Sequence, residues 1–216
     1  MKLRKKVMEI KAFKMFFTMG ILFIIIGLGI FFKIEYDEYI EEKNIQNISS
    51  QLIIQIEEKE EVVVETEEIV INNPIIQEEV FEPRKETAGI LINGKEYIGY
   101  IEIPSRNIQW PILAYYNDND VKMAPALYYG NIDDGAVICG HNYKSHFAHL
   151  HYLKIGDIVN FTDTNNETIE YVVDKIEILK PSQIADMTLT DYALTLFTCT
   201  TGGEERLTLR LSKNNK

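Results

Sequence analysis

The sequence predicts an all-β barrel or sandwich domain with short helices, preceded by one membrane-spanning helix. An apolar run without a charged residue covers residues 15–32. The C-terminal part holds several short strand-like segments separated by turns, which is typical of all-β folds rather than of alternating strands and helices. The last segment, residues 206–211, alternates polar and apolar residues strictly, as a half-buried strand does.

The apolar run predicts how the chain meets the membrane. Its 18 residues, at about 1.5 Å each, nearly span the roughly 30 Å of hydrocarbon in a bilayer. The tail 1–14 carries six basic residues against Glu9 alone. By the positive-inside rule, the tail stays in the cytoplasm and the rest of this single-pass membrane protein is extracytoplasmic. A cleaved signal peptide is the alternative, but the run is long for one, and no small-residue cleavage site follows it.

An acidic segment, residues 33–87, follows the predicted membrane helix. Between Glu35 and Glu86 there are 16 acidic and four basic residues, which account for most of the net charge of -11. Such a tract predicts a solvated extracytoplasmic linker without its own core. An acidic chain also argues against nucleic acid as a partner. We expect no required cofactor; calcium is an alternative ligand for these carboxylates, although no EF-hand spacing is present.

The remaining residues, 88–216, are enough for one ordinary core and form the predicted catalytic domain. Pro111 predicts an edge or bulged position within its strand, and residues 118–122 predict a short helix. The predicted strands cover residues 97–103, 108–113, 135–141, 158–162, 168–179, 193–199 and 206–211.

The two C-terminal strands place a thiol beside a guanidinium. If Cys199 faces Arg206 across the turn at 200–205, the leucines of both strands share one buried face. A cation there can stabilise a thiolate, or an oxyanion formed on a substrate. Arg210 lies further from the turn, so we interpret it as structural or substrate-lining. This register gives the pairs Cys199–Arg206, Phe197–Thr208 and Thr195–Arg210.

A nucleophilic cysteine needs an acid or base, and the chain has four histidines. His141 ends a buried-looking strand, which gives it a fixed and accessible position. His146, His149 and His151 lie in a segment that reads as a polar loop. They could instead form a zinc site with Cys139, although their spacing matches no common zinc pattern. Cys139 itself is interpreted as a small buried thiol, with a disulfide to Cys199 as the alternative.

These residues resemble a known family. Thr195-Leu196-Phe197-Thr198-Cys199 is similar to the Thr-Leu-x-Thr-Cys signature of sortases, the membrane-anchored cysteine transpeptidases of Gram-positive bacteria, and Gly140-His141-Asn142 resembles their histidine motif. Residues 99–104 and 147–157 resemble further family segments, so the likeness spans roughly residues 89–212. It implies an eight-stranded sortase β-barrel in which Cys199 is the nucleophile, His141 the acid/base and Arg206 the cation near the scissile carbonyl. Thr198 is carried over as a substrate-binding residue.

The resemblance also implies a reaction and its partners. Surface proteins with a C-terminal sorting motif of the Leu-Pro-x-Thr-Gly type would be cleaved through a thioester on Cys199. They would then be transferred to an amine of a peptidoglycan precursor or another acceptor. The chain has no Asp-Pro pair, ends without a second apolar segment, and has a short stretch at 180–192. These features favour surface-protein attachment over pilus polymerisation and over class B sortases. A hydrolytic cell-envelope cysteine peptidase and an inactive anchored binding module are the alternatives.

Overall fold

The computed structural model describes residues 2–70, 88–132 and 134–214 of the chain. Helix α1 (Lys2–Val70) begins the chain and runs through two compact units, Met1–Glu41 and Glu42–Lys216. In the first unit, the apolar side chains of residues 15–32 are exposed. This helix is long and apolar enough to cross a membrane.

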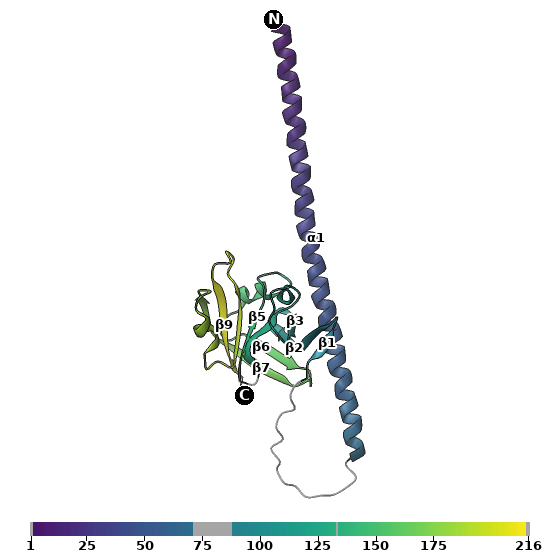
Figure 1. Cartoon of the computed structure of the whole chain (residues 1–216), viewed down its shortest axis with the longest axis vertical. Coiled ribbons are helices and arrows are strands. Elements are labelled where there is room, and N and C mark those ends of the chain that lie inside the picture. Colours follow the sequence, from purple (N-terminus) through teal and green to yellow (C-terminus); the bar gives the residue numbers. More distant parts are fainter. Residues whose placement is uncertain (1, 71–87, 133, 215–216) are drawn as a thin grey trace. The chain divides into compact units, whose positions relative to one another are not determined.

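Among its described residues, the second unit contains nine strands and several short helices. Figure 1 shows this strand-rich unit. The strands are β1 (Ile90–Ile92), β2 (Lys95–Ile103), β3 (Ile108–Leu113), β4 (Ala126–Asn131), β5 (Asp134–Cys139), β6 (Ile158–Asp163), β7 (Thr168–Leu179), β8 (Leu194–Cys199) and β9 (Arg206–Lys213). The helices between them are η1 (Pro104–Arg106), η2 (Asp120–Lys122), η3 (Phe147–Tyr152) and α2 (Ile184–Thr188).

Eight of these strands form a closed mixed barrel, as predicted. Their order is β2-β3-β4-β5-β8-β9-β7-β6, and antiparallel pairing of β6 with β2 closes the barrel. Two neighbouring pairs, β3–β4 and β5–β8, are parallel. Strand β1 pairs with the start of β2, on the side where β6 pairs further along.

Gly99 makes the closure possible. It pairs with Asp163 of β6 beside a register shift in β2, at a φ of 143°. A Cβ atom at this position would come within 2.1 Å of the Thr162 carbonyl oxygen. Only glycine therefore lets the first and last strands of the barrel approach one another here.

The leucines of β8 and β9 fill the barrel interior, as the predicted register requires. Leu194 pairs with Leu211 and Leu196 with Leu209, and all four side chains are fully buried. Their other interior neighbours are apolar residues of β2, β3, β5, β6 and β7. Pro111 lies in β3, which pairs along its length with β2 but with β4 only at Leu113. Proline has no N–H to donate, and on the β4 side no strand is paired with Pro111 that would need one.

The prediction of a solvated acidic linker is wrong for its first half. Residues 42–59 are helical, and four apolar side chains on one face of the helix are buried against β1, β2, β3 and the segment after β3. These apolar residues recur every three or four positions, so they lie on one side of the helix, and the glutamates face solvent. The four residues are Ile45, Ile48, Leu52 and Ile56. The predicted boundary at residue 88 stays a prediction, because residues 71–87 lie outside the described part of the chain.

The segment interpreted as a polar loop also contributes to the core. Phe147 and Leu150 of η3 and the following Leu153 are buried in the barrel interior. Trp110 meets Phe147 edge to face, with ring centroids 5.2 Å apart. His146 is 1% exposed. Although this segment is rich in histidine, its apolar residues Phe147, Leu150 and Leu153 pack into the barrel. They fix the position of the chain shortly after His141.

Candidate active site

Parallel pairing of β5 with β8 brings His141 and Cys199 to the same edge of the barrel. Cys139 pairs with Phe197, and the Gly140 N–H donates to the Phe197 carbonyl oxygen at 3.2 Å. His141 and Cys199 each follow this pair by two residues, so both lie where the two strands end. Because parallel strands end at the same edge, both side chains emerge there together.

Antiparallel pairing of β8 with β9 puts Arg206 on the other side of Cys199. The structure confirms the predicted pairs Cys199–Arg206, Phe197–Thr208 and Thr195–Arg210. The turn between the strands is closed by a hydrogen bond from the Thr200 N–H to the Glu205 carbonyl oxygen, 3.0 Å. The Arg206 guanidinium donates to the carbonyl oxygens of Gly203 and Glu205, each at 3.2 Å. These bonds hold it over the turn without a carboxylate partner among the described residues.

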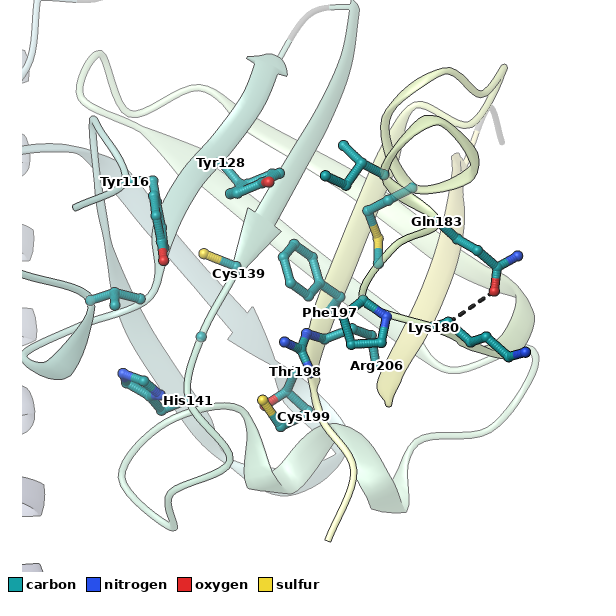
Figure 2. A pocket seen from close by; sticks show the side chains of 15 residues that line it. Tyr116, Tyr128, Cys139, His141, Lys180, Gln183, Phe197, Thr198, Cys199 and Arg206 are labelled. Atoms are coloured by element: carbon teal, nitrogen blue, oxygen red, sulfur yellow. Dashed lines mark hydrogen bonds between the residues drawn. The ribbon is translucent and has the colours of Figure 1, made fainter. Parts of the chain in front are cut away.

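The three side chains line one pocket of about 270 Å³. Figure 2 shows His141 across this pocket from Cys199 and Arg206. Aromatic rings of Tyr116, Tyr128 and Phe197 form part of its wall, and Tyr128 meets Phe197 edge to face at 5.4 Å. Residues of the β7–β8 connection, including α2, form the opposite wall. A peptide bound there would be held beside a thiol, an imidazole and a guanidinium.

His141 is held between other rings and carries a lowered pKa. Its ring stacks on Tyr143 at 4.7 Å between centroids, and its Nε2 atom is buried without a hydrogen-bond partner among the described residues. Burial lowers the pKa of His141, and the nearby Lys122 ammonium lowers this pKa further. Neither effect favours the imidazolium, so His141 is mainly neutral at pH 7 and can accept a proton.

His146 is a second histidine close to His141, and sequence reasoning gave it no separate role. The two rings lie 6.3 Å apart between centroids. Burial, followed by the neighbouring His141, lowers the pKa of His146 to about 4, although a hydrogen bond with the Met123 backbone acts in the opposite direction. His146 is therefore neutral over the working range of most enzymes, and it is not among the residues that line the pocket.

The remaining histidines and Cys139 do not assemble into a metal site. Within the described residues, no group of three or more His, Cys, Asp or Glu side chains is placed to hold a metal ion. His151 Nε2 instead lies 3.4 Å from the Cys199 carbonyl oxygen, and the His149 ring packs against Trp110.

Both cysteines are free thiols, so the alternative disulfide is not formed. Cys139 and Cys199 line the same pocket, but Cys139 is aligned with Phe197, two residues before Cys199. Strand geometry then separates their Cα atoms by about 8 Å, beyond the roughly 7 Å that a disulfide can bridge. Cys139 is buried, and this burial raises the pKa of its thiol to about 12.

Thr198 and Arg210 differ in their relation to the pocket. Thr198 lines the pocket but is only 1% exposed, and its hydroxyl has no hydrogen-bond partner among the described residues.

Arg210 is also buried, but on the outer face of the barrel. It donates to Glu177 at 2.8 Å and to the hydroxyl of Thr195 at 3.0 Å. It also donates to the Asp186 and Met187 carbonyl oxygens of α2. Arg210 therefore fastens α2 to the barrel.

A family model described as the sortase domain matches residues 101–213, just over half of the chain. The chain belongs to the sortase family. As a sortase it is a cysteine transpeptidase with a role in cell-wall sorting. Among curated proteins, no sequence matches it.

Several solved sortase structures are similar to this one. Sortase C1 from Streptococcus agalactiae is 26% identical, with a TM-score of 0.50 over 55% of this sortase and 70% of that chain. Sortase C from Clostridium perfringens SM101 is 28% identical, with a TM-score of 0.47 over 56% of this chain and 71% of that one. Sortase A from Corynebacterium diphtheriae is 19% identical and covers 80% of this chain and 96% of its own, with a TM-score of 0.50, a likeness of fold.

Proposed function

We propose that this sortase cleaves a Leu-Pro-x-Thr-Gly-like sorting motif of surface proteins and transfers the acyl part to a cell-wall amine, with Cys199 as nucleophile. The observation that carries the proposal is that His141, Cys199 and Arg206 line one pocket, where β5 and β8 end and β9 begins. A nucleophile, a proton carrier and a cation are the groups that acyl transfer through a thioester requires.

Proton transfer follows from the neutral His141. The imidazole accepts the Cys199 thiol proton as sulfur attacks the threonyl carbonyl carbon, and Arg206 stabilises the resulting oxyanion. The carbon–nitrogen bond then breaks, and the imidazolium returns its proton to the leaving amine. An incoming amine attacks the thioester, its proton passes to His141, and Cys199 leaves as the thiolate that takes the proton back.

The membrane arrangement belongs to the same proposal. The apolar part of α1 anchors the enzyme, and the six basic residues before it keep the N-terminus in the cytoplasm. The active site then faces the extracytoplasmic side, where surface proteins and peptidoglycan precursors are available to it.

The direct test is an acyl-enzyme on Cys199. The full chain in detergent micelles is incubated with sorting peptides of the Leu-Pro-x-Thr-Gly type, and adducts are located by intact and peptide mass spectrometry. We expect an adduct with the mass of the N-terminal peptide portion on Cys199. Cys199→Ala should abolish it, whereas Cys139→Ala should retain it.

Capture of the acyl group separates a transferase from a hydrolase. Adding an amine such as a glycine peptide should convert the adduct into an amide product and restore free enzyme. A product formed only with water, at every amine concentration, would identify a hydrolytic peptidase instead. Failure of every peptide to acylate a folded, reduced enzyme would overturn the proposed chemistry.

A further inference from the structure

The substrate pocket is positively charged in an acidic protein. Of the 15 residues that line it, Lys180 and Arg206 are basic and none is acidic, although the whole chain carries a net charge of -11. Lys122 adds a further positive charge near His141. A pocket lined by one sign of charge attracts ligands of the opposite sign.

Lys180 directly follows the row of paired residues that contains Cys199 and Arg206. Cys199 pairs with Arg206, and Arg206 in turn pairs with Leu179 of β7. Lys180 directly follows Leu179, and its backbone N–H donates to the Gln183 side chain at 2.8 Å. Two strand spacings separate Cys199 from Leu179, about 10 Å. Figure 2 shows Lys180 on the Arg206 side of the pocket, with its side chain extended away from Cys199.

Two acidic groups near this wall are already engaged. Asp186 accepts a hydrogen bond from the Gln183 amide at 2.7 Å. Glu177 pairs with Lys175 and with Arg210. Over the described part of the chain, the Lys180 ammonium has no ion pair, and its side chain is exposed at the rim of the pocket. Its charge is therefore unpaired, and its flexible four-carbon stem lets it turn towards a peptide bound in the pocket.

We propose that Lys180 is a specificity-determining residue that selects sorting peptides with a carboxylate side chain within about three residues of the scissile bond. This inference rests on the proposed function. The limit of three residues follows from the 10 Å between strands, because an extended peptide advances about 3.3–3.6 Å per residue.

The test varies one peptide position at a time. Peptide sets that differ only in Glu, Gln or Lys at each position flanking the scissile bond are incubated with the full chain in detergent micelles. Acylation of Cys199 is then followed by mass spectrometry. At one position we expect kcat/KM to be about three- to fivefold higher for Glu than for Gln, the size of a partly exposed ion pair, and lowest for Lys. The preference should weaken in high salt.

Three variants identify the source of the preference. Lys180→Met should remove it, and Lys180→Glu should reverse it in favour of the lysine peptide. Lys154→Met is the matched control, since Lys154 is also exposed but does not line the pocket. This control should keep the parent preference. An equal preference in Lys180→Met and the parent would overturn the inference.

Binding to Cys199→Ala separates this inference from the proposed chemistry. Fluorescence anisotropy with the same labelled peptides needs no acylation. A Lys180-dependent preference for the Glu peptide in binding, without any acyl-enzyme in the parent, would support the inference and overturn the proposed function. Acylation at equal rates by the Glu, Gln and Lys peptides at every position would overturn the inference and leave the proposed function intact.

Discussion

Two thiols share one pocket but differ sharply in environment. Cys139 is buried and its pKa is raised to about 12, whereas Cys199 is partly exposed at a strand end. Because only the thiolate reacts readily, iodoacetamide at pH 8 should alkylate Cys199 and spare Cys139 until the protein unfolds. Peptide mapping by mass spectrometry checks this. Alkylation of Cys139 in the folded enzyme, at a rate like that of Cys199, would contradict the assignment of Cys199 as the reactive thiol.

His146 should make the fold sensitive to acid. Its pKa is about 4 in the folded protein but about 6.5 in an unfolded chain. The unfolded state therefore binds an extra proton between these values, so the free energy of unfolding falls as pH drops from 6.5 towards 4. The full effect of this one group is about 3 kcal/mol.

Chemical denaturation across this pH range measures the effect. His146→Gln should flatten the dependence on pH, because glutamine does not titrate. His149→Gln, in the partly exposed neighbour on η3, is the control and should keep the parent slope. A parent-like slope in His146→Gln would assign the acid sensitivity to other groups.

Residues 42–59 of α1 are an integral part of the folded unit rather than a spacer. Leu52 is fully buried against the barrel, whereas Ile54 on the same helix is 52% exposed. Leu52→Ala should therefore lower the free energy of unfolding by about 2–4 kcal/mol, and Ile54→Ala by less than about 0.5 kcal/mol. Denaturation of the full chain in detergent compares the two variants. Equal losses would show that this stretch of helix does not pack on the barrel in solution.

Arg210 determines where the α2 wall of the pocket lies. It joins β9 to the carbonyl oxygens of α2, and Ile184 and Met187 of α2 line the pocket. Arg210→Met should cost about 2 kcal/mol of stability and raise KM severalfold with a smaller change in kcat. Steady-state kinetics with a sorting peptide checks the split, which a loss of stability alone would not produce. A large loss of kcat at constant KM would instead place Arg210 in the chemistry.

The sequence predicts local pairing well and distant packing less well. Alternation in two neighbouring strands was enough to predict the β8–β9 register, including Cys199 opposite Arg206. Strand β7 was likewise predicted from its apolar content. Strand β4 was missed because it pairs with β3 at one residue and with β5 through register shifts, which leave no regular alternation. The helical stripe beginning at Ile45 was detectable from its spacing, but the surrounding glutamates suggested a solvated tract.

The assembly of the site depends on pairing between remote parts of the chain. Residues 139 and 197 are 58 positions apart in sequence but are neighbours in the β5–β8 ladder. Nothing in local alternation specifies such a pairing, so His141 was predicted to act with Cys199 only from the cysteine's need for an acid or base and from the family resemblance. The lowered pKa of His141 was equally beyond prediction, because it depends on burial and on Lys122 from another element.

The proposed membrane orientation predicts which reagents can reach the enzyme in cells. In intact protoplasts, a membrane-impermeant maleimide should label Cys199 without lysis. In a Cys199→Ala background, Ala12→Cys places a thiol in the basic tail, and we expect that thiol to be labelled only after lysis. Mass shifts on electrophoresis read out both sites. Labelling of the tail alone in intact protoplasts would establish the reverse orientation.

The pairing of β6 with β2 affects how readily copies of the enzyme can associate on a membrane surface. An open sheet exposes unpaired backbone groups on which a second copy can add its own strand. Here the ladder returns on itself, and in the described part of the chain the unpaired strand edges are short: β1, with three residues, and the part of β3 before its single pair with β4. Copies concentrated on one surface therefore present little template for mutual strand addition. By permitting the closure of the barrel, Gly99 leaves fewer strand edges open to such addition.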